Sequence, residues 1–190
     1  MNSMSMSATE LKAALSLSAV FFLRMLPLFM LLPVLSLAGE SYQYSTPQLL
    51  GIALGIYGLT QASLQIPFGM LSDRFGRKPI ICLGLIIFII GSLIAAMSDS
   101  VYGLILGRAL QGSGAIAAAI MALAADLSTE QHRTKVMALI GISIGISFSV
   151  AFVIGPLLYN YIGINGLFYF GICLAILAIL TLLIIVPNPP

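Results

Sequence analysis

Residues 69–78 read GMLSDRFGRK, and this decapeptide, which lies between two long apolar stretches, decides how the surrounding chain folds. Gly76 permits a tight turn between two antiparallel helices. Asp73 places an anion at a helix end, where it can cap the N-terminus of a neighbouring helix. Arg77 and Lys78 hold the loop at one membrane surface. The stretch therefore predicts a helical hairpin whose connection carries most of the local charge.

Charge is scarce in the rest of the chain. Only 8 basic and 6 acidic residues occur among 190, or 7% against about 25% in an ordinary soluble domain. Such a chain cannot cover a soluble globule, and its 60% hydrophobic content excludes disorder. A net charge of +2 does not suggest nucleic-acid binding. Long unbroken apolar runs differ from the short alternating segments of a membrane β-barrel. The composition therefore predicts a protein that is mostly in contact with lipid.

Six stretches have the ~20 apolar residues that a helix needs to cross a bilayer. Each must be helical, because no water is present to satisfy the backbone of an open strand. We therefore predict an all-α membrane protein with six transmembrane helices in one bundle over residues 1–186. The spans are 15–35, 49–71, 79–97, 101–123, 136–158 and 167–186.

The first span could be mistaken for a signal peptide, because Lys12 precedes it and Ser36-Leu37-Ala38 resembles a cleavage site. Its apolar region is too long, however, and Arg24 interrupts it, so we expect it to be retained. Cys82 and Cys173 lie in spans near opposite membrane faces, and no disulfide is expected between them.

The basic residues outside the spans predict the orientation. All six lie before the first span or in the connectors after spans two and four: Lys12, Arg74, Arg77, Lys78, Arg133 and Lys135. The other connectors hold Glu40 and Asp99 and no basic residue. The positive-inside rule then places both termini in the cytoplasm of a multi-pass inner-membrane protein.

Two arginines lie within spans, Arg24 in the first and Arg108 in the fourth. An arginine at a span centre costs about 2.5–3.5 kcal/mol on insertion scales, so both should face a polar interior or water. We interpret them as parts of a substrate or proton pathway. The alternative is that they only hold the bundle together by hydrogen bonds.

Other polar residues recur at helical spacing. Tyr57, Gln61 and Gln65 share one face of span two, and Gln111 shares a face of span four with Arg108. Spans one, two, four and five therefore look like cavity walls, with these residues along the pathway, while spans three and six look like lipid-facing supports. The alternative is that the glutamines only bond neighbouring helices.

Small residues favour close helix packing at several positions. The candidates for helix packing are Gly112, Gly114, Gly141, Gly145, Gly155 and Pro156. Pro156 should also bend the end of span five.

The decapeptide resembles the signature loop of the major facilitator superfamily, G-x-L-a-D-r-x-G-r-k, and departs from it only at Ser72. A second match in span four resembles the family pattern l-x-x-x-R-x-x-q-G-x-g-a; its residues are Leu104, Arg108, Gln111, Gly112, Gly114 and Ala115. The sequence is most similar to the drug-antiporter-like branch, particularly its bacterial YajR-type transporters.

The resemblance implies one half of a twelve-helix fold, built as a 3+3 inverted repeat, with residues 187–190 beginning the central cytoplasmic linker. The partner would be the missing C-terminal six-helix half or a second copy of this chain. The resemblance also implies a conformational gate in which Asp73 meets a helix of the other half and Arg77 pairs with an acid. The gate residues would be Gly69, Asp73, Arg74, Gly76, Arg77, Lys78 and Asp126, and Arg108 would take part in proton coupling.

Two features depart from the antiporter pattern. Gly155-Pro156 is not followed by the two glycines of the family's motif, which makes strict antiport less certain. All six carboxylates lie near span ends, and arginine hardly titrates, so no mid-membrane proton carrier is evident. We expect His132 to lie at the cytoplasmic surface and to be a poor proton carrier. The carrier would then come from the absent half or from a carboxylate at a span end.

We therefore predict a secondary active transporter that moves a small molecule across the inner membrane by alternating access, as proton-coupled efflux. A uniporter or symporter of a polar or anionic solute remains an alternative, as does a non-transporting receptor or assembly subunit. The sequence holds no metal-ligand cluster, nucleophile–histidine pair or phosphate-binding glycine loop, so we expect no enzyme activity, no metal and no cofactor beyond the proton gradient. Nothing in the sequence names the substrate.

Overall fold

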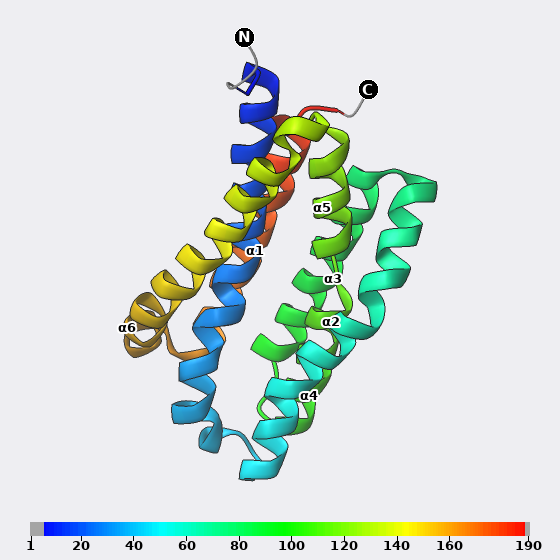
Figure 1. Ribbon diagram of the computed structural model, residues 1–190. Helices are drawn as coiled ribbons and strands as arrows, with labels where there is room; N and C mark the ends of the chain where they lie inside the picture. The colour runs from blue at the N-terminus through cyan, green and yellow to red at the C-terminus, as the bar shows by residue number, and fades with distance from the viewer. Residues whose placement is uncertain (1–5, 189–190) are drawn as a thin grey trace.

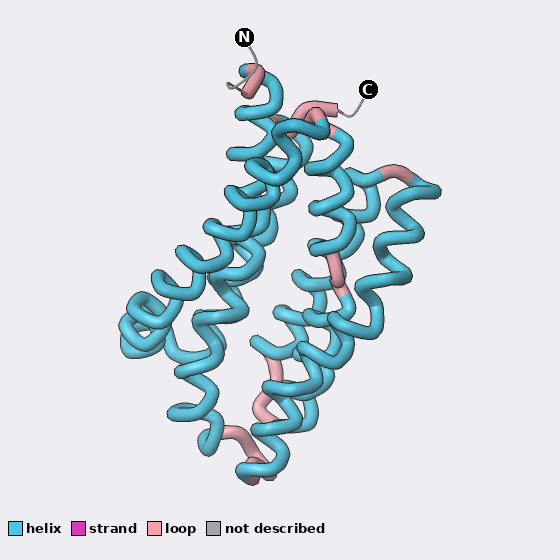
Figure 2. Tube along the Cα trace, viewed as in Figure 1, coloured by secondary structure: helices cyan, strands magenta, loops and turns pink. Residues whose placement is uncertain are grey.

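The computed structural model describes residues 6–188, and this part of the chain is a bundle of helices joined by short connectors (Figures 1 and 2). The elements in chain order are α1 (Ala8–Ala38), the 3-10 turn η1 (Gly39–Ser41), α2 (Pro47–Phe75), α3 (Arg77–Ala96), α4 (Val101–Ser113), α5 (Ala117–Asp126) and α6 (Glu130–Ile184). No strand occurs within residues 6–188, and the all-α fold predicted from the sequence is confirmed.

Local sequence explains where several helices begin and end. α1 begins with a capping box, in which the Ser7 hydroxyl accepts from the Glu10 N–H and the Glu10 carboxylate accepts from the Ser7 N–H. The Thr46 hydroxyl caps α2, and Pro47 supplies the first helical residue, where its missing N–H costs nothing. Gly76 separates α2 from α3 at φ 94°, a conformation that side chains disfavour.

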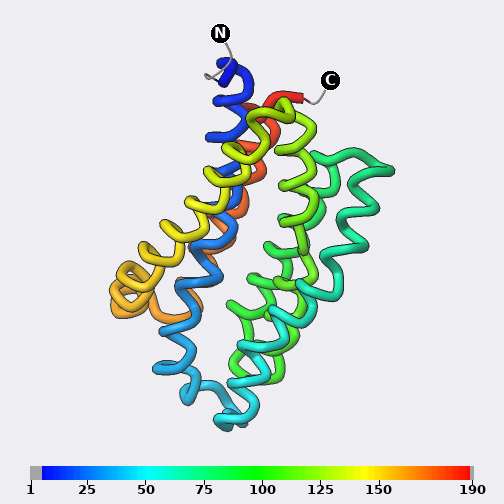
Figure 3. The backbone as a smooth tube through the Cα atoms, viewed as in Figure 1, coloured from blue at the N-terminus to red at the C-terminus, as the bar shows by residue number. Residues whose placement is uncertain are grey.

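The long helix α6 contains two membrane-crossing segments. Its 55 residues would extend about 80 Å as one helix, far beyond the ~30 Å core of a bilayer. At Gly163 the backbone leaves the helical region, with φ 66° and ψ −177°. The chain turns back there, so the two parts of α6 run in opposite directions (Figure 3). The bundle therefore has six crossing segments.

The fourth predicted span, 101–123, differs from the structure because it is broken into α4 and α5. The break falls at Gly114–Ile116, where the Ile116 N–H donates to the Gly114 carbonyl at 3.0 Å. Glycine is a poor helix former, by about 1 kcal/mol relative to alanine, and Gly112 and Gly114 flank Ser113 here. The helix therefore opens in the middle of the fourth predicted span.

The helices form two groups in the view of Figure 1, with α1 beside α6 on one side and α2 to α5 on the other. The helix α3 joins the groups because it packs against both α4 and α6. Its buried face includes Ile81, Leu85 and Phe88, whereas Leu83 and Ile86 are exposed. Span three is therefore an internal partner as well as the lipid-facing support that the sequence analysis expected.

We call the end of the bundle that holds the start of α1 and the end of α6 the terminal end (Figure 1). The junctions between α2 and α3 and between α5 and α6 lie at the same end, so all six basic residues outside the spans gather there. Glu40 and Asp99 lie at the opposite end, in η1 and before α4.

At the opposite end, backbone hydrogen bonds join two connectors. The Gln43 N–H donates to the Asp99 carbonyl at 2.9 Å, and the Val101 N–H donates to the Gln43 carbonyl at 3.1 Å. Beside them, burial and the nearby Asp99 carboxylate raise the pKa of Tyr42 to about 12. These contacts fix the connectors, and Tyr42 stays neutral at physiological pH.

The two cysteine thiols, Cys82 and Cys173, are free.

Candidate functional site

The signature loop at the terminal end is organised around Arg77, the first residue of α3. Its Nε lies 2.8 Å from Asp126 Oδ2, at the end of α5, and its Nη1 forms an ion pair with Asp73 on α2. The same Nη1 donates to Ser72 Oγ at 2.8 Å. One guanidinium therefore joins the ends of α2, α3 and α5, and the Arg77–Asp126 contact implied by the family resemblance is present.

This cluster is partly open to its surroundings. The side chains of Asp73 and Asp126 are 63% and 39% exposed, and that of Arg77 is 17% exposed. Ion pairs with exposed members contribute only about 0–1 kcal/mol, because water competes for both charges. The contacts can therefore be exchanged cheaply, and Asp73 remains available to a further partner.

The other loop residues do not all join this cluster. Lys78 Nζ donates to the Val186 carbonyl at 2.6 Å and to Asn188 Oδ1 at 2.8 Å, so it holds the segment after α6. Arg74 stacks on Phe75, with Cζ 5.4 Å from the ring centroid. A Cβ on Gly69 would lie 3.4 Å from Ala118 Cβ, which places α2 close to α5.

A second polar cluster lies in the middle of the bundle, around Arg108. Its Nη1 donates to Gln111 Oε1 at 2.8 Å, and its Nε donates to the Ala53 carbonyl on α2 at 3.3 Å. The Gln111 amide donates to Ser92 Oγ on α3 at 2.8 Å. Sequence reasoning missed Ser92, because a single serine in an apolar span carries no signal of its own. The cluster links α2, α3 and α4.

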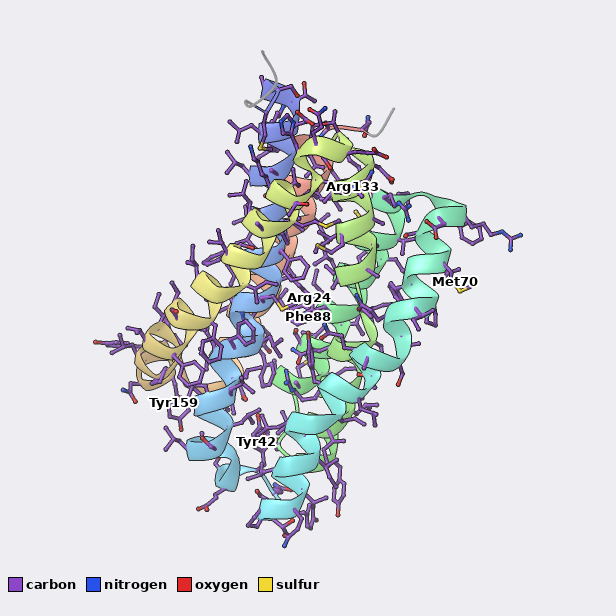
Figure 4. The ribbon with its side chains drawn as sticks, in the orientation of Figure 1. Arg24, Tyr42, Met70, Phe88, Arg133 and Tyr159 are labelled. Carbon is purple, nitrogen blue, oxygen red and sulfur yellow. The ribbon has the colours of Figure 1, made fainter. Side chains whose placement is uncertain are left out.

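Arg24 of α1 reaches into the same region through the break between α4 and α5 (Figure 4). Its Nη2 donates to the carbonyls of Gln111, at 3.0 Å, and Gly114, at 3.4 Å. Its Cζ lies 4.0 Å from the centroid of the Phe88 ring, a cation–π contact. The break exposes carbonyls that would accept hydrogen bonds within a continuous helix. Arg24 donates to these carbonyls instead.

Tyr57 lies between the two arginines. Its ring centroid is 5.6 Å from Arg24 Cζ and 4.6 Å from Arg108 Cζ. Within residues 6–188 the Tyr57 hydroxyl and the Nε and Nη1 of Arg24 are buried without a hydrogen-bond partner. The centre of the bundle thus holds two guanidinium cations. Arg24 and Tyr57 also keep hydrogen-bond donors that no described residue accepts.

Both arginines are enclosed. Arg24 is 2% exposed, Arg108 0% and Gln111 1%. Carbonyl and amide oxygens and aromatic rings of the same bundle surround their guanidinium groups, and these groups form a polar interior around both arginines. The role of the two arginines in a substrate or proton pathway stays a prediction.

Gln61 and Gln65 lie further along α2 and are half-buried. Among residues 6–188 neither is hydrogen-bonded to the arginines, and Gln65 Oε1 has no partner. The structure therefore brings Arg24, Tyr57, Arg108 and Gln111 together but leaves these two glutamines outside the central cluster.

The glycines predicted to favour helix packing fall into two groups: some lie close to another helix, and others face open space. A Cβ on Gly112 would lie 2.2 Å from the Tyr57 carbonyl oxygen, and one on Gly114 would lie 2.1 Å from that of Gly84. Gly155, which precedes Pro156 in α6, comes almost as close to α1, at 2.9 Å from the Met30 carbonyl oxygen.

By contrast, a Cβ on Gly141 or Gly145 would meet no atom of the described chain within 4 Å. Both lie on an open face of α6, so the helix packing expected at these two positions does not occur inside this bundle.

His132, expected at the surface, is buried at 7% exposure beside Glu10 and Thr129. The separation of 122 residues between Glu10 and His132 hid this contact from sequence reasoning. The available signals were the capping box before α1 and the Thr-x-x-His spacing at the start of α6, neither of which indicates a pairing.

Comparison with known proteins agrees with this geometry. Residues 17–190 match the Major Facilitator Superfamily, and the chain belongs to that superfamily. It is 55% identical over 188 residues to the inner membrane transport protein YajR of Escherichia coli (strain K12), a match that spans 99% of this chain and 41% of YajR. The resemblance noted in the sequence analysis is thereby confirmed.

More distant relatives share the architecture. The chain is 33% identical over 114 residues to the class B tetracycline resistance protein of Escherichia coli, across 60% of this chain and 27% of that protein. The crystal structure of the human organic anion transporter MFSD10 (TETRAN) superimposes with a TM-score of 0.79 at 19% identity, over 96% of this chain and 49% of the other, which shows a common fold. The chain thus spans half or less of the length of these relatives, whose names describe transport or resistance and not enzymes.

Proposed function

We propose that the chain forms one half of a secondary active transporter that moves a small organic molecule out across the bacterial inner membrane by alternating access, with proton coupling. The observation that carries this proposal is the Arg77 cluster, in which one guanidinium pairs with both Asp73 and Asp126. Such a cluster is cheap to break and joins three helix ends at one membrane face. It suits an interface with two alternative states.

The direction of transport is proposed from the relatives and the charges. YajR is named an inner membrane transport protein, and the class B relative is named for tetracycline resistance, which efflux would explain. The basic residues at the terminal end favour a cytoplasmic location for that end and for both termini. The Arg77 cluster would then close the cytoplasmic side.

A second six-helix half is part of the proposal, supplied by the same polypeptide or by another copy. The helix α2 is largely uncovered in this bundle, with Gln61 and Gln65 only half-buried. Polar side chains of this kind are unfavourable against lipid. Gly141 and Gly145 on α6 likewise offer open space for another helix. These features favour a partner that covers α2 and α6 and encloses the substrate path.

The proton carrier is proposed to lie outside the central arginine cluster. Arg24 and Arg108 supply fixed positive charge, because guanidinium groups hardly titrate. Arg108 would then act indirectly, by favouring a carboxylate or an anionic substrate group that approaches from the other half. The carboxylates and the histidine of this chain lie near the helix ends.

The proposal is tested with the full-length transporter in proteoliposomes that carry an imposed pH gradient. We expect a lipophilic drug to be transported against its gradient while a trapped pH dye reports proton movement in the opposite direction. Transport that ignores the pH gradient would indicate a uniporter. Proton movement in the same direction as the substrate would indicate a symporter.

Transport of an anionic solute is a second candidate, favoured by the buried Arg24 donors that lack a partner within residues 6–188. An acceptor that entered after a rearrangement could use them. In the same vesicles, a monocarboxylate would then be transported better than its amide analogue. Equal rates for the two compounds would remove this candidate.

A further inference from the structure

A buried polar cluster at the terminal end joins the start of α1 to the start of α6. Glu10 Oε1 accepts from the Thr129 N–H at 2.9 Å and from the Thr129 hydroxyl at 2.8 Å. Glu10 Oε2 accepts from the Ser7 N–H at 2.9 Å. One carboxylate therefore satisfies backbone donors at the N-terminal ends of two helices, where an anion is also favoured by the helix dipoles.

His132 completes this cluster. Its Nδ1 lies 3.2 Å from Glu10 Oε2, 3.3 Å from Oε1 and 3.2 Å from Thr129 Oγ1. Its Nε2 is buried without a partner in the described part of the chain. Because a carboxylate only accepts, Nδ1 must carry a proton to bond Glu10. A second proton on Nε2 would convert this hydrogen bond into an ion pair.

The position of the cluster relates it to the Arg77 cluster. Residues 127–129 connect α5 to α6, and each end of this connector is tied to a different helix. Asp126, just before it, bonds Arg77 of α3, and Thr129, at its end, bonds Glu10 of α1. A hydrogen bond from Ser128 Oγ to the Ala124 carbonyl, at 2.7 Å, holds the connector against α5. A displacement of Thr129 would therefore be transmitted to Asp126 over three residues.

We propose that Glu10 and His132 are positioning residues of the Arg77 cluster, which hold the α5–α6 connector so that Asp126 stays within reach of Arg77. This proposal rests on the gating role given to that cluster above. Neither residue contacts the substrate. Each acts through Thr129 and the connector.

The surrounding helices carry further charges: Lys12 lies on α1, Asp126 on α5, Arg77 and Lys78 on α3, and Glu130, Arg133 and Lys135 on the first part of α6. The described contacts of the Glu10 carboxylate, however, come from Ser7, Thr129 and His132. The hold on the connector therefore depends on these three residues.

Hydrogen exchange of the full-length transporter in nanodiscs tests the proposal, because the Thr129 N–H itself donates to Glu10. We expect E10A to lower the protection of the connector peptide about five-fold, because the Thr129 N–H loses an acceptor worth about 1 kcal/mol. H132A should lose part of the protection, because Nδ1 no longer holds the Glu10 carboxylate beside Thr129, whereas H132N keeps a donor near Nδ1 and should keep the protection. E130Q, which changes an exposed carboxylate in the first turn of α6, is the control.

The second readout is access to the terminal end, measured by modification of a single engineered cysteine at Phe68, which is buried at 7% exposure, in a cysteine-free background. Modification should increase in E10A and H132A and stay at the wild-type level in H132N and E130Q. The proposal is overturned if connector protection is the same in E10A and E130Q, or if H132A and H132N protect the connector equally. If protection changes as expected but access does not, Glu10 and His132 hold the connector without positioning a gate, and the proposal also fails. Absence of transport, by contrast, would count against the proposed function while leaving the exchange result valid.

Discussion

The two arginine clusters of this bundle place the same side chain in opposite surroundings. At the terminal end, Arg77 meets two carboxylates that are 63% and 39% exposed. In the centre, Arg24 and Arg108 are enclosed and bond carbonyl and amide oxygens, with no carboxylate within the described hydrogen bonds of either. An ion pair at the surface can be exchanged for water at little cost, whereas a buried guanidinium cannot leave its acceptors without a large penalty. The comparison teaches that the Arg77 cluster suits a contact that changes between two conformations. The central cluster of Arg24 and Arg108 suits a fixed link between helices, which we call the strut.

The strut is tested most severely by removing Arg24. Arg24→Ala should lower the free energy of unfolding by about 2–4 kcal/mol, because hydrogen bonds from a charged group are lost and the Gln111 and Gly114 carbonyls are left without it. Arg24→Lys should recover only part of this loss, since a point charge cannot reach both carbonyls and stack on Phe88. Thermal unfolding in detergent micelles measures both. Equal stability of Arg24→Ala and the wild type would show that the central cluster is not a strut.

The close approach of α3 to the α4–α5 break is the next test. Gly114→Ala should destabilise the bundle by about 1–3 kcal/mol, because the new methyl group would overlap the Gly84 carbonyl. Gly141→Ala is the matched control, since open space surrounds that position within the described chain. The same unfolding measurement on both variants checks the contrast. If Gly141→Ala destabilised the full transporter as much as Gly114→Ala, another helix would have to lie against this face of α6.

Enclosure itself can be measured by thiol chemistry. A cysteine at Arg108 should react with a water-soluble maleimide at least about tenfold more slowly than one at Met70, which is 67% exposed, because a thiol must be ionised and reachable to react. Residues 24 and 108 would line a water-filled cavity if cysteines at these positions reacted as quickly as the exposed control.

The smallest effect is expected at Ser72, the one position where the loop departs from the family pattern. Its hydroxyl accepts from Arg77 Nη1 and donates to the Gly69 carbonyl at 2.7 Å. Ser72→Ala should cost about 0.5–1 kcal/mol and leave the Asp73 and Asp126 contacts in place. Unfolding of the variant, together with the salt dependence of its cluster, checks this. A loss above about 2 kcal/mol would mean that the hydroxyl, and not the carboxylates, organises Arg77.

The sequence was sufficient for the parts of the fold that depend on local composition. Apolar runs predicted an all-α membrane bundle, and the spacing of charges predicted that one end would be basic. The decapeptide indicated the hairpin around Gly76 and, through its family resemblance, the contact between Arg77 and Asp126. The apolar runs and the hairpin used residues that lie within one span or one loop, whereas the Arg77–Asp126 contact, across 49 residues, came only from the family pattern.

The sequence was insufficient where a residue depends on partners far along the chain. At the break, the Gly114 carbonyl accepts from Arg24, which lies 90 residues earlier. His132 is buried because Glu10 and Thr129 surround it, a contact that no local pattern indicates. Arg24 and Arg108 were expected to face a polar interior or water, but the sequence does not say which groups would supply that interior. For Arg24 the acceptors are carbonyls beside the helix break, which periodicity cannot predict.

The central claim is that the Arg77 cluster holds the terminal end closed, and Asp126→Asn tests it most directly. The change removes the charge that Arg77 Nε meets at 2.8 Å but keeps the size of the side chain. In the full-length transporter in proteoliposomes, a cysteine at Phe68, which is buried at 7% exposure, should become several-fold more accessible to a membrane-impermeant reagent applied at the terminal end, while the exposed control Glu130→Gln leaves its reactivity unchanged. If Asp126→Asn and Glu130→Gln give the same accessibility as the wild type, the Arg77 cluster does not control access and the account is contradicted.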